Sequence, residues 1–222
     1  GHRLVSVRRI ASGKVRLVFD SPGGTVQRDF HAVVLALPFS VLRDVEMHAS
    51  LELPAWKSLA INASAMGNHA RVAVGFQSPF WHTQQGLSGS GYSDLQRVQA
   101  TWEARPSAEA GDATVLAAHI GGEAALALGR QGVQADAAAF LSQLELVMRG
   151  ARARARRDAS GQLLAHVESW SHNPFAKGSY SYTRPGYFTT QADNEAKAVG
   201  NLLFAGDHTS SIHEWQGFME GA

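Results

Sequence analysis

The part of the sequence best suited to chemistry is its last stretch, Asn201–Ala222, which reads NLLFAGDHTSSIHEWQGFMEGA. Apolar residues from Leu202 to Ala205 predict a short buried strand with Asp207 just beyond its carboxyl end, and the opening of a helix is expected near Trp215. Ligands of open α/β sheets bind outside the carboxyl ends of strands, and helix N-termini carry unpaired N–H groups and a partial positive charge. The stretch therefore predicts a carboxylate that accepts hydrogen bonds from sugar-type hydroxyls, beside an electropositive helix end that faces an electron-rich ring.

The same stretch closely resembles the C-terminal FAD-binding signature of the flavin-containing amine oxidase family, which includes monoamine oxidases, L-amino acid oxidases and polyamine oxidases. The resemblance is carried by Phe204–Thr209, FAGDHT, and by Gly217–Ala222, GFMEGA. It implies an FAD whose ribityl hydroxyls meet Asp207, where the family more often has glutamate, and whose N1–C2=O edge meets backbone N–H groups that stabilise negative charge. An ordinary turn after a strand is the alternative interpretation. The implied cofactor-binding residues here are Gly206, Asp207, Gly217, Phe218 and Met219.

A second group of residues lies upstream of this signature. Trp170, followed by Gly178-Ser179-Tyr180, resembles the family segment that lines the substrate side of the flavin, which implies cofactor contacts for Trp170 and Ser179. Some members attach the flavin through a cysteine at the position of Ser179, and serine cannot form that thioether, so the implied FAD is non-covalent. Tyr180 and Phe218 match two walls of an aromatic cage that positions an amine nitrogen and helps to exclude water. A core tyrosine and simple packing of Phe218 on the flavin ring are the alternatives.

The resemblance implies functional roles for two further residues. Counting back from Pro79-Phe80-Trp81 places Arg71 where the family commonly has a lysine that holds a water near flavin N5. Arginine keeps the charge in a larger planar donor that stays protonated, so Arg71 either serves that water or indicates slow reaction with oxygen; an ordinary surface-strand arginine is the alternative. Val5 matches a valine whose backbone meets the adenine, and plain core strand is its alternative interpretation.

The elements expected to position these residues follow from the apolar pattern. Period-2 alternation and apolar runs predict strands over 4–10, 15–19, 30–37, 70–76, 98–103 and 114–120, with turns at 12–13 and 21–24. The run 30–37, FHAVVLAL, is typical of a strand buried on both faces. Helices are predicted over 40–45, 123–128 and 136–148. The buried face of the last helix is expected to comprise Phe140, Leu141, Leu144, Val147 and Met148.

The predicted fold class is α/β, as the C-terminal part of a two-domain, Rossmann-like FAD-binding flavoprotein with an α+β substrate domain. Residues 1–50 and 166–222 are expected to belong to the FAD-binding domain, and residues 51–165 to a substrate-binding domain with a mixed sheet and helices. The G-x-G-x-x-G dinucleotide fingerprint of such proteins is absent from the sequence. We therefore expect a truncated piece of a longer protein that does not bind FAD tightly by itself.

The reaction implied by the resemblance is hydride transfer to FAD from the carbon that bears the nitrogen of an amine or amino acid. Imine hydrolysis follows, and O2 reoxidises the flavin with release of H2O2; the cofactor performs the chemistry and the protein supplies position and electrostatics. Two alternatives stay open. One is a desaturase-like flavoenzyme that acts on C–C bonds, which the pair Tyr180 and Phe218 disfavours, and the other is a non-catalytic degenerate flavoprotein, which Arg71 favours. Arg184 is the candidate here for binding a substrate carboxylate.

Composition excludes several classes of function. The 222 residues are 45% hydrophobic, enough for a packed core, and the net charge of +1 with interspersed acids and bases indicates no nucleic-acid surface. No run reaches the roughly 18 apolar residues of a membrane span. The absence of cysteine excludes disulfides and thiolate metal ligands without specifying a compartment. Scattered histidines without helical pair spacing predict no metal site, and the basic run 152–157 is expected to be a solvated edge, with an anionic-partner site as the alternative.

Overall fold

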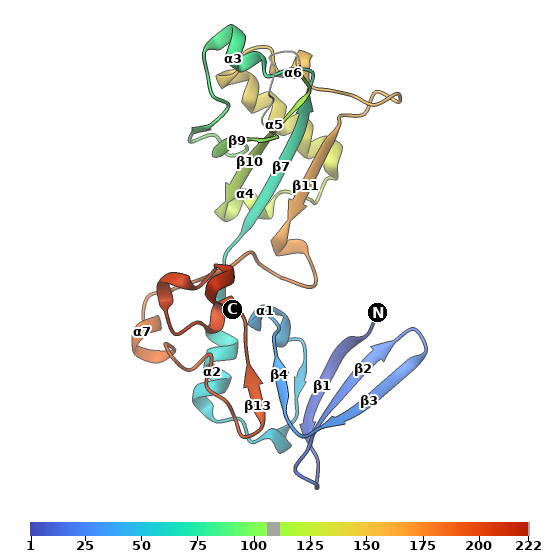
Figure 1. Cartoon of the computed structure of the whole chain (residues 1–222), viewed down its shortest axis with the longest axis vertical. Helices are drawn as coiled ribbons and strands as arrows, with labels where there is room; N and C mark the ends of the chain where they lie inside the picture. Colours follow the sequence, from blue (N-terminus) through green and yellow to red (C-terminus); the bar gives the residue numbers. More distant parts are fainter. Residues whose placement is uncertain (106–111, 222) are drawn as a thin grey trace. The chain divides into compact units, whose positions relative to one another are not determined.

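The computed structural model describes residues 1–105 and 112–221, which form two compact units. Unit 1 comprises Gly1–Gly67 and Pro174–Ala222, and unit 2 comprises Asn68–Asn173. Figure 1 shows that the strands of each unit pair within that unit. Each unit also has its own apolar core. Ala222, the last residue of the FAD-binding signature, lies outside the described residues.

Unit 1 opens with an antiparallel meander of three strands, β1 (Arg3–Arg9), β2 (Val15–Ser21) and β3 (Gly24–Phe30). The expected turns at residues 12–13 and 21–24 are confirmed, because β1 pairs with β2 and β2 with β3 in antiparallel register. The short strand β5 (Glu46–Met47) runs parallel to β1 on its other edge. This four-stranded sheet carries the start of the chain, including Val5.

Two short parallel strands from opposite ends of the chain form a second sheet in unit 1. They are β4 (Val33–Leu35) and β13 (Leu202–Phe204), and the expected strand before Gly206 is thereby confirmed. The expectation of a strand buried on both faces over 30–37 is wrong. Successive side chains of a strand point to opposite faces, and while Val33 and Leu35 enter the core, Val34 is 59% exposed. Among the described residues, only one face of this pair is covered.

Helices cover the packed face of unit 1. The predicted helix after Pro38 is present as α1 (Phe39–Leu42), whereas α2 (Ala55–Ala63) was not predicted from the sequence. Ala60 and Ile61 of α2 join the apolar core formed around the short parallel strands. The signal for α2 is Pro54, which stands at its N-cap and whose fixed φ suits a helix start. A 3-10 turn, η1 (Ala49–Leu51), connects β5 to this helix.

The remaining elements of unit 1 lie near its C-terminal part. β6 (Ala65–Met66) pairs antiparallel with β12 (Ser181–Tyr182), and α7 (Tyr187–Thr190) follows. Three 3-10 turns come after β13, namely η3 (Asp207–Thr209), η4 (His213–Trp215) and η5 (Met219–Gly221). The described chain after β13 therefore continues as short 3-10 turns.

Unit 2 is built on a five-stranded sheet in the order β11-β7-β10-β9-β8. The strands predicted over 70–76, 98–103 and 114–120 are confirmed within a few residues, while β8 and β11 were not predicted. Neighbouring strands are antiparallel throughout. The strands are β7 (His69–Phe76), β8 (Gly91–Tyr92), β9 (Ala100–Arg105), β10 (Thr114–Gly121) and β11 (Ala165–Ser169).

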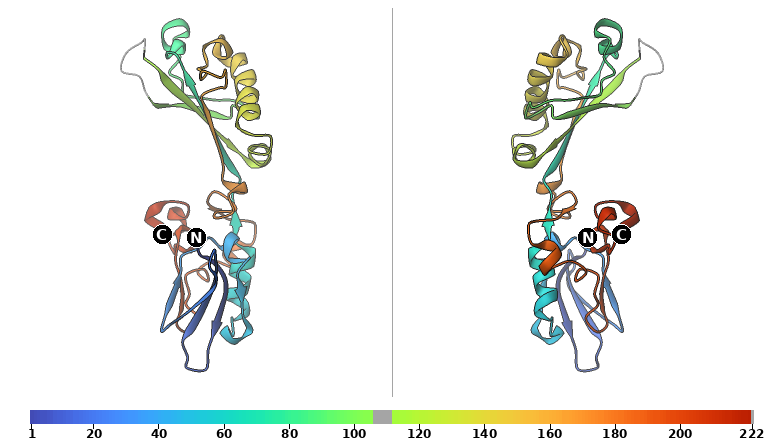
Figure 2. Two further views of the ribbon diagram at one scale, coloured as in Figure 1. Left: turned by 90° about the vertical axis from the view of Figure 1, so that its right-hand side faces the viewer. Right: turned by 90° about the vertical axis from the view of Figure 1, so that its left-hand side faces the viewer.

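One face of this sheet is covered by α5 (Val133–Val147), which both views of Figure 2 show lying along it. The predicted stripe is confirmed for Phe140, Leu141, Leu144 and Met148, but Val147 is 46% exposed. Val147 is the last residue of α5, and Met148 already has a non-helical backbone. The other helices of unit 2 are α3 (Phe80–Gln85), α4 (Gly122–Leu126), which was predicted, and α6 (Ala151–Arg154).

The units change over at residues 67/68 and 173/174, whereas the sequence places boundaries near 50 and 165. The difference arises because α2 packs into the core of unit 1 and β11 pairs with β7.

The arginine run 152–157 does not form one row of charges. Arg154 stacks over Phe80 and bonds Gln84, while Arg157 donates to the carbonyl of Gly161.

Candidate functional site

Two segments of unit 1 emerge at the same edge of the short parallel sheet. Val33 pairs with Leu202 and Leu35 with Phe204, so β4 and β13 both end there. The carboxyl edge of parallel strands is where ligands bind in open α/β sheets. Pro38 follows the first strand, and Asp207 follows the second.

A cavity of about 380 Å³ opens at this edge. Three separate stretches of the chain supply its walls: the residues after β4, the residues before β12, and the C-terminal stretch from Gly206 to Met219. The structure thus brings together seven residues that the sequence assigned to cofactor or substrate. They are Ser179, Tyr180, Gly206, Asp207, Gly217, Phe218 and Met219.

Asp207 is the charged residue of this cavity. It begins the turn η3, is half-buried, and lies 3.7 Å from Nδ1 of His208 through its Oδ1. His208 beside it, and backbone N–H groups that include that of Gly217, lower the pKa of the Asp207 carboxyl below its usual value of 3.8. The carboxylate is therefore ionised at neutral pH and offers acceptor lone pairs to hydroxyl groups.

Ser179 and Tyr180 are held in the cavity wall by backbone hydrogen bonds to Gly67. Gly67 accepts from the N–H of Ser179 (2.9 Å) and donates to the carbonyl of Tyr180 (2.7 Å). The hydroxyl of Ser179 also donates to the Gly67 carbonyl at 3.0 Å. Gly178 has φ 145°, and a Cβ there would lie 2.4 Å from Cβ of Met66, so this approach requires glycine.

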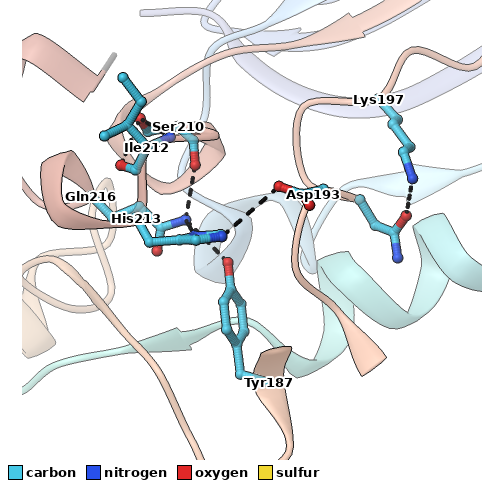
Figure 3. A network of polar contacts seen from close by, with 8 residues as sticks. Tyr187, Asp193, Lys197, Ser210, Ile212, His213 and Gln216 are labelled. Carbon is cyan, nitrogen blue, oxygen red and sulfur yellow. Dashed lines mark hydrogen bonds and ion pairs between the residues drawn. The ribbon is translucent and has the colours of Figure 1, made fainter. Parts of the chain in front are cut away.

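A polar network fixes the turn that precedes Gly217. Figure 3 shows Gln216 between its partners: its Nε2 donates to the hydroxyl of Tyr187 (3.0 Å) and the carbonyl of Ser210 (3.1 Å). Nδ1 of His213 lies 3.3 Å from the same nitrogen, and Nε2 of His213 lies 3.9 Å from Asp193. Burial raises the pKa of Tyr187 to about 12, so its hydroxyl stays protonated. The segment that carries Phe218 and Met219 is thereby anchored to α7.

The helix expected near Trp215 is not formed in the described residues. η4 and η5 are separate three-residue turns, and between them Gln216 is extended and Gly217 has φ 89°. A turn of this length aligns too few peptides to create a helix dipole. The electropositive helix end expected beside the carboxylate is therefore absent from the described part of this segment. The backbone N–H of Gly217 nevertheless helps to lower the pKa of Asp207.

Val5 lies at a different place in unit 1. The β1–β2 register passes from Leu4, opposite Phe19, to Ser6, opposite Val18, so Val5 is the extra residue of a β-bulge. A bulged residue leaves the regular ladder, and its backbone groups are re-aimed. Val5 lines a second cavity of about 380 Å³, and it is not brought together with the residues around Asp207.

Arg71 and Trp170 belong to unit 2, and the structure places each within that unit. Arg71 is exposed on β7, and its guanidinium lies 5.7 Å from the centre of the Trp102 ring. In the register Arg71 stands opposite His119 of β10 and Glu168 of β11, so the three share one face of the sheet. Burial, and then Arg71, lower the pKa of His119.

Trp170 begins the 3-10 turn η2 (Trp170–His172) directly after β11 and is 39% exposed. Arg184, the candidate for a substrate carboxylate, is in unit 1, where its Nε donates to the hydroxyl of Tyr182 at 3.3 Å. That hydrogen bond leaves other guanidinium donors for a ligand.

Sequence reasoning missed three residues of the cavity wall, Ala36, Pro38 and His208. The first two could have been found by pairing the predicted strand 30–37 with the strand before Gly206, because parallel neighbours end at one edge. His208 belongs to the FAGDHT motif, but the sequence assigned it no contact with cofactor or substrate. In residues 1–105 and 112–221, no cluster of three or more histidine, aspartate or glutamate side chains is arranged for a metal, and no helix has the length and apolarity to cross a membrane.

The chain is similar to known proteins over its whole length. The family described as flavin containing amine oxidoreductase matches the chain over residues 1–222. The chain is 26% identical to probable polyamine oxidase 4 of Arabidopsis thaliana, covering 100% of the chain and 41% of that relative. It is 28% identical to histone demethylase-like protein A of Aspergillus fumigatus, covering 82% of the chain and 17% of that relative.

Solved structures show the same fold. Cyclohexylamine oxidase from Brevibacterium oxydans matches with a TM-score of 0.73 at 22% identity, over 98% of this chain and 44% of that one. A putrescine oxidase bound to putrescine matches with a TM-score of 0.76 at 18% identity, over 99% of this chain and 45% of that one. The chain thus spans less than half the length of these relatives.

Proposed function

Because the chain belongs to the flavin containing amine oxidoreductase family, we propose that it is part of an FAD-dependent oxidoreductase that acts on an amine or amino acid. The observation that carries the proposal is the cavity at the shared end of β4 and β13. Seven residues chosen from the sequence for cofactor or substrate contacts line it, and they come from separate parts of the chain. Relatives named polyamine oxidase and cyclohexylamine oxidase support an amine as the substrate.

The residues of the cavity fit a flavin cofactor. An ionised carboxylate at Asp207 suits the hydroxyls of a ribityl chain, and Gly206 and Gly217 line the same cavity. Backbone N–H groups near Met219 would meet the N1–C2=O edge. At the second cavity, the bulged backbone of Val5 would meet the adenine.

Attachment would be non-covalent, because serine at 179 cannot form a thioether. The Ser179 hydroxyl instead donates a hydrogen bond to the carbonyl of Gly67, which helps to hold the cavity wall in place. On the family resemblance alone, Trp170 is also proposed as a cofactor contact. We further propose that the dinucleotide fingerprint lies in a part of the polypeptide outside this sequence, since the relatives are more than twice as long.

A bound FAD would supply the acceptor for the hydride from the carbon that bears the substrate nitrogen; water would hydrolyse the resulting imine, and O2 would reoxidise the reduced cofactor with release of H2O2. The side chains of this chain would position and shield the substrate. Tyr180 and Phe218 would form two aromatic walls that hold the nitrogen without a strong hydrogen bond to its lone pair. Arg71 would hold a water near the reacting centre through a guanidinium that stays protonated.

The test is an absorbance spectrum of the intact polypeptide that contains this chain, recorded with and without a panel of amines, amino acids and polyenes. We expect a yellow protein that an amine or amino acid bleaches in the absence of oxygen. Asp207→Ala is expected to lose the flavin, while Asp207→Glu, which keeps the carboxylate, is expected to retain it. A colourless wild-type protein that takes up no FAD would overturn the proposal, and bleaching by a polyene alone would reassign the reaction to C–C bonds.

A further inference from the structure

His208 is a buried histidine whose role the proposed function leaves open. It lies in the turn η3, has only 3% of its surface exposed, and lines the same cavity as Asp207. Among the described residues, neither of its ring nitrogens has a hydrogen-bond partner. A buried N–H without a partner costs free energy and is rare in folded proteins. Packing alone therefore does not explain a histidine at this position.

The backbone at Gly206 leaves space for the His208 ring. Gly206 has φ 136°, and a Cβ at this residue would lie 2.7 Å from Cε1 and 2.9 Å from Nδ1 of His208. Any side chain at 206 would collide with the imidazole, so glycine is required here. On another side the ring meets Phe39 of α1 edge to face, with centroids 4.4 Å apart. The imidazole is thus held between a glycine and an aromatic ring.

Asp207 is the charged side chain that faces this imidazole. Nδ1 of His208 lies 3.7 Å from Oδ1 of Asp207, which is ion-pair distance but longer than a hydrogen bond. A small rotation of the half-buried carboxylate would close that gap. A carboxylate offers about four acceptor positions, so a bond from His208 would leave others for a ligand. Tyr180 is the only other ionisable residue among the described residues that line the cavity.

We propose that His208 is a positioning residue for the cofactor: its Nδ1–H donates to Asp207 and fixes the carboxylate so that the free lone pairs face the ribityl hydroxyls. The inference rests on the proposed function, in which Asp207 receives those hydroxyls. In this arrangement the proton that His208 donates is the one on Nδ1. The requirement for glycine at 206 follows from the same arrangement, because the ring must lie over that residue to reach the carboxylate.

Three substitutions separate the position of the donor from the bulk of the ring. His208→Asn keeps an amide N–H near the place of Nδ1, His208→Gln places its N–H near that of Nε2, and His208→Leu removes the donor. The first measurement needs no cofactor: the carboxyl group of Asp207 is titrated by carbon-13 NMR in the full chain. We expect the Asp207 pKa to rise in the leucine and glutamine variants and to stay near the wild-type value in the asparagine variant. Identical titration curves in all four proteins would overturn the proposal.

The second measurement follows the release of FAD from the intact polypeptide as the pH is lowered, using the fluorescence of free flavin. We expect binding about tenfold weaker in the leucine and glutamine variants, with release at a higher pH, and wild-type behaviour in the asparagine variant. Phe39→Leu is the matched control, because it loosens the same ring but keeps the donor. It is expected to lower thermal stability without moving the pH of release.

The two measurements distinguish this inference from the proposed function. A wild-type polypeptide that takes up no FAD, while the NMR titration shows the expected shifts, would overturn the proposed function and the cofactor role of His208 with it. A wild-type polypeptide that binds FAD, while the leucine variant releases it at the wild-type pH, would overturn the inference alone.

Discussion

Three consecutive residues at the end of β13 share one confined space. Gly206 has no side chain, and the buried His208 ring lies in the space that a side chain would occupy. Asp207 lies between these two residues and lines the cavity. The conformation of Gly206, with φ 136°, is one that other residues rarely adopt. Backbone strain and side-chain contact therefore both act on this position, and they can be separated by experiment.

Gly206→Ala is expected to lower the free energy of unfolding by about 1–3 kcal/mol, because the new Cβ strains the backbone and meets the His208 ring. Gly13→Ala is the matched control, since Gly13 also has a positive φ, 78°, but a Cβ added there would meet no atom within 4 Å. Chemical denaturation of the full chain measures both. Adding His208→Ala to the Gly206 variant should recover the part of the loss that comes from contact. A double variant that is as unstable as the sum of its singles would show that strain alone acts.

At the scale of elements, side chains rather than regular structure fix the segment between β12 and the C-terminal turns. Lys57 of α2 is fully buried and donates to the carbonyls of Asn194 (2.6 Å) and Glu195 (2.8 Å). Its ammonium also lies 4.0 Å from the centre of the Phe204 ring. The ammonium of Lys57 therefore links α2 to the loop at residues 194–195 and to β13.

Burial lowers the pKa of Lys57 from 10.5 to about 8. Between pH 8 and 10.5 the unfolded chain therefore holds a proton that the folded chain has lost, so the free energy of unfolding rises with pH in this window. Lys57→Met should remove that rise, although it also removes two hydrogen bonds and lowers stability at pH 7. Lys14→Met, at the first hairpin, is the control. Urea unfolding measured from about pH 7 to 10 tests this, and an unchanged slope in the Lys57 variant would contradict it.

Gln216 anchors the turn that leads into the cavity wall (Figure 3). Gln216→Ala removes the donor to the Tyr187 hydroxyl and to the Ser210 carbonyl, and we expect a loss of about 1–2 kcal/mol in the free energy of unfolding. We also expect weaker FAD binding, because Phe218 and Met219 follow directly. Gln27→Ala, on the exposed strand β3, is the control and should change neither quantity. Full retention of flavin affinity in the Gln216 variant would show that this turn does not shape the cavity.

The sequence could predict the elements whose apolar period is strong, and it failed where tertiary contacts decide. The strand before Gly206 and the helix with Phe140 and Leu144 follow from local patterns. The helix expected near Trp215 does not form in the described residues, since an extended Gln216 and a positive φ at Gly217 interrupt it. The contact between His208 and Gly206 could not be predicted, because a ring that folds back over its own backbone leaves no periodic signal.

At the scale of the whole molecule, residues 1–105 and 112–221 contain two apolar cores with no residue in common. The core of unit 1 includes Leu42 of α1, and the core of unit 2 includes Leu144 of α5. Both leucines are fully buried. Cooperative unfolding extends over residues that share a packed core, so each unit is expected to have its own unfolding free energy.

Leu42→Ala and Leu144→Ala form a matched pair that tests this independence. Each substitution is expected to lower the free energy of unfolding by about 2–5 kcal/mol, because it removes buried methyl groups and leaves a cavity. Amide hydrogen exchange followed by mass spectrometry on peptides from both units gives the measurement. Leu144→Ala should speed exchange in residues 112–173 and leave strands β1 and β2 protected as in the wild type, and Leu42→Ala should do the reverse. If either substitution speeds exchange equally in both units, the two cores unfold as one cooperative unit and the expected independence is wrong.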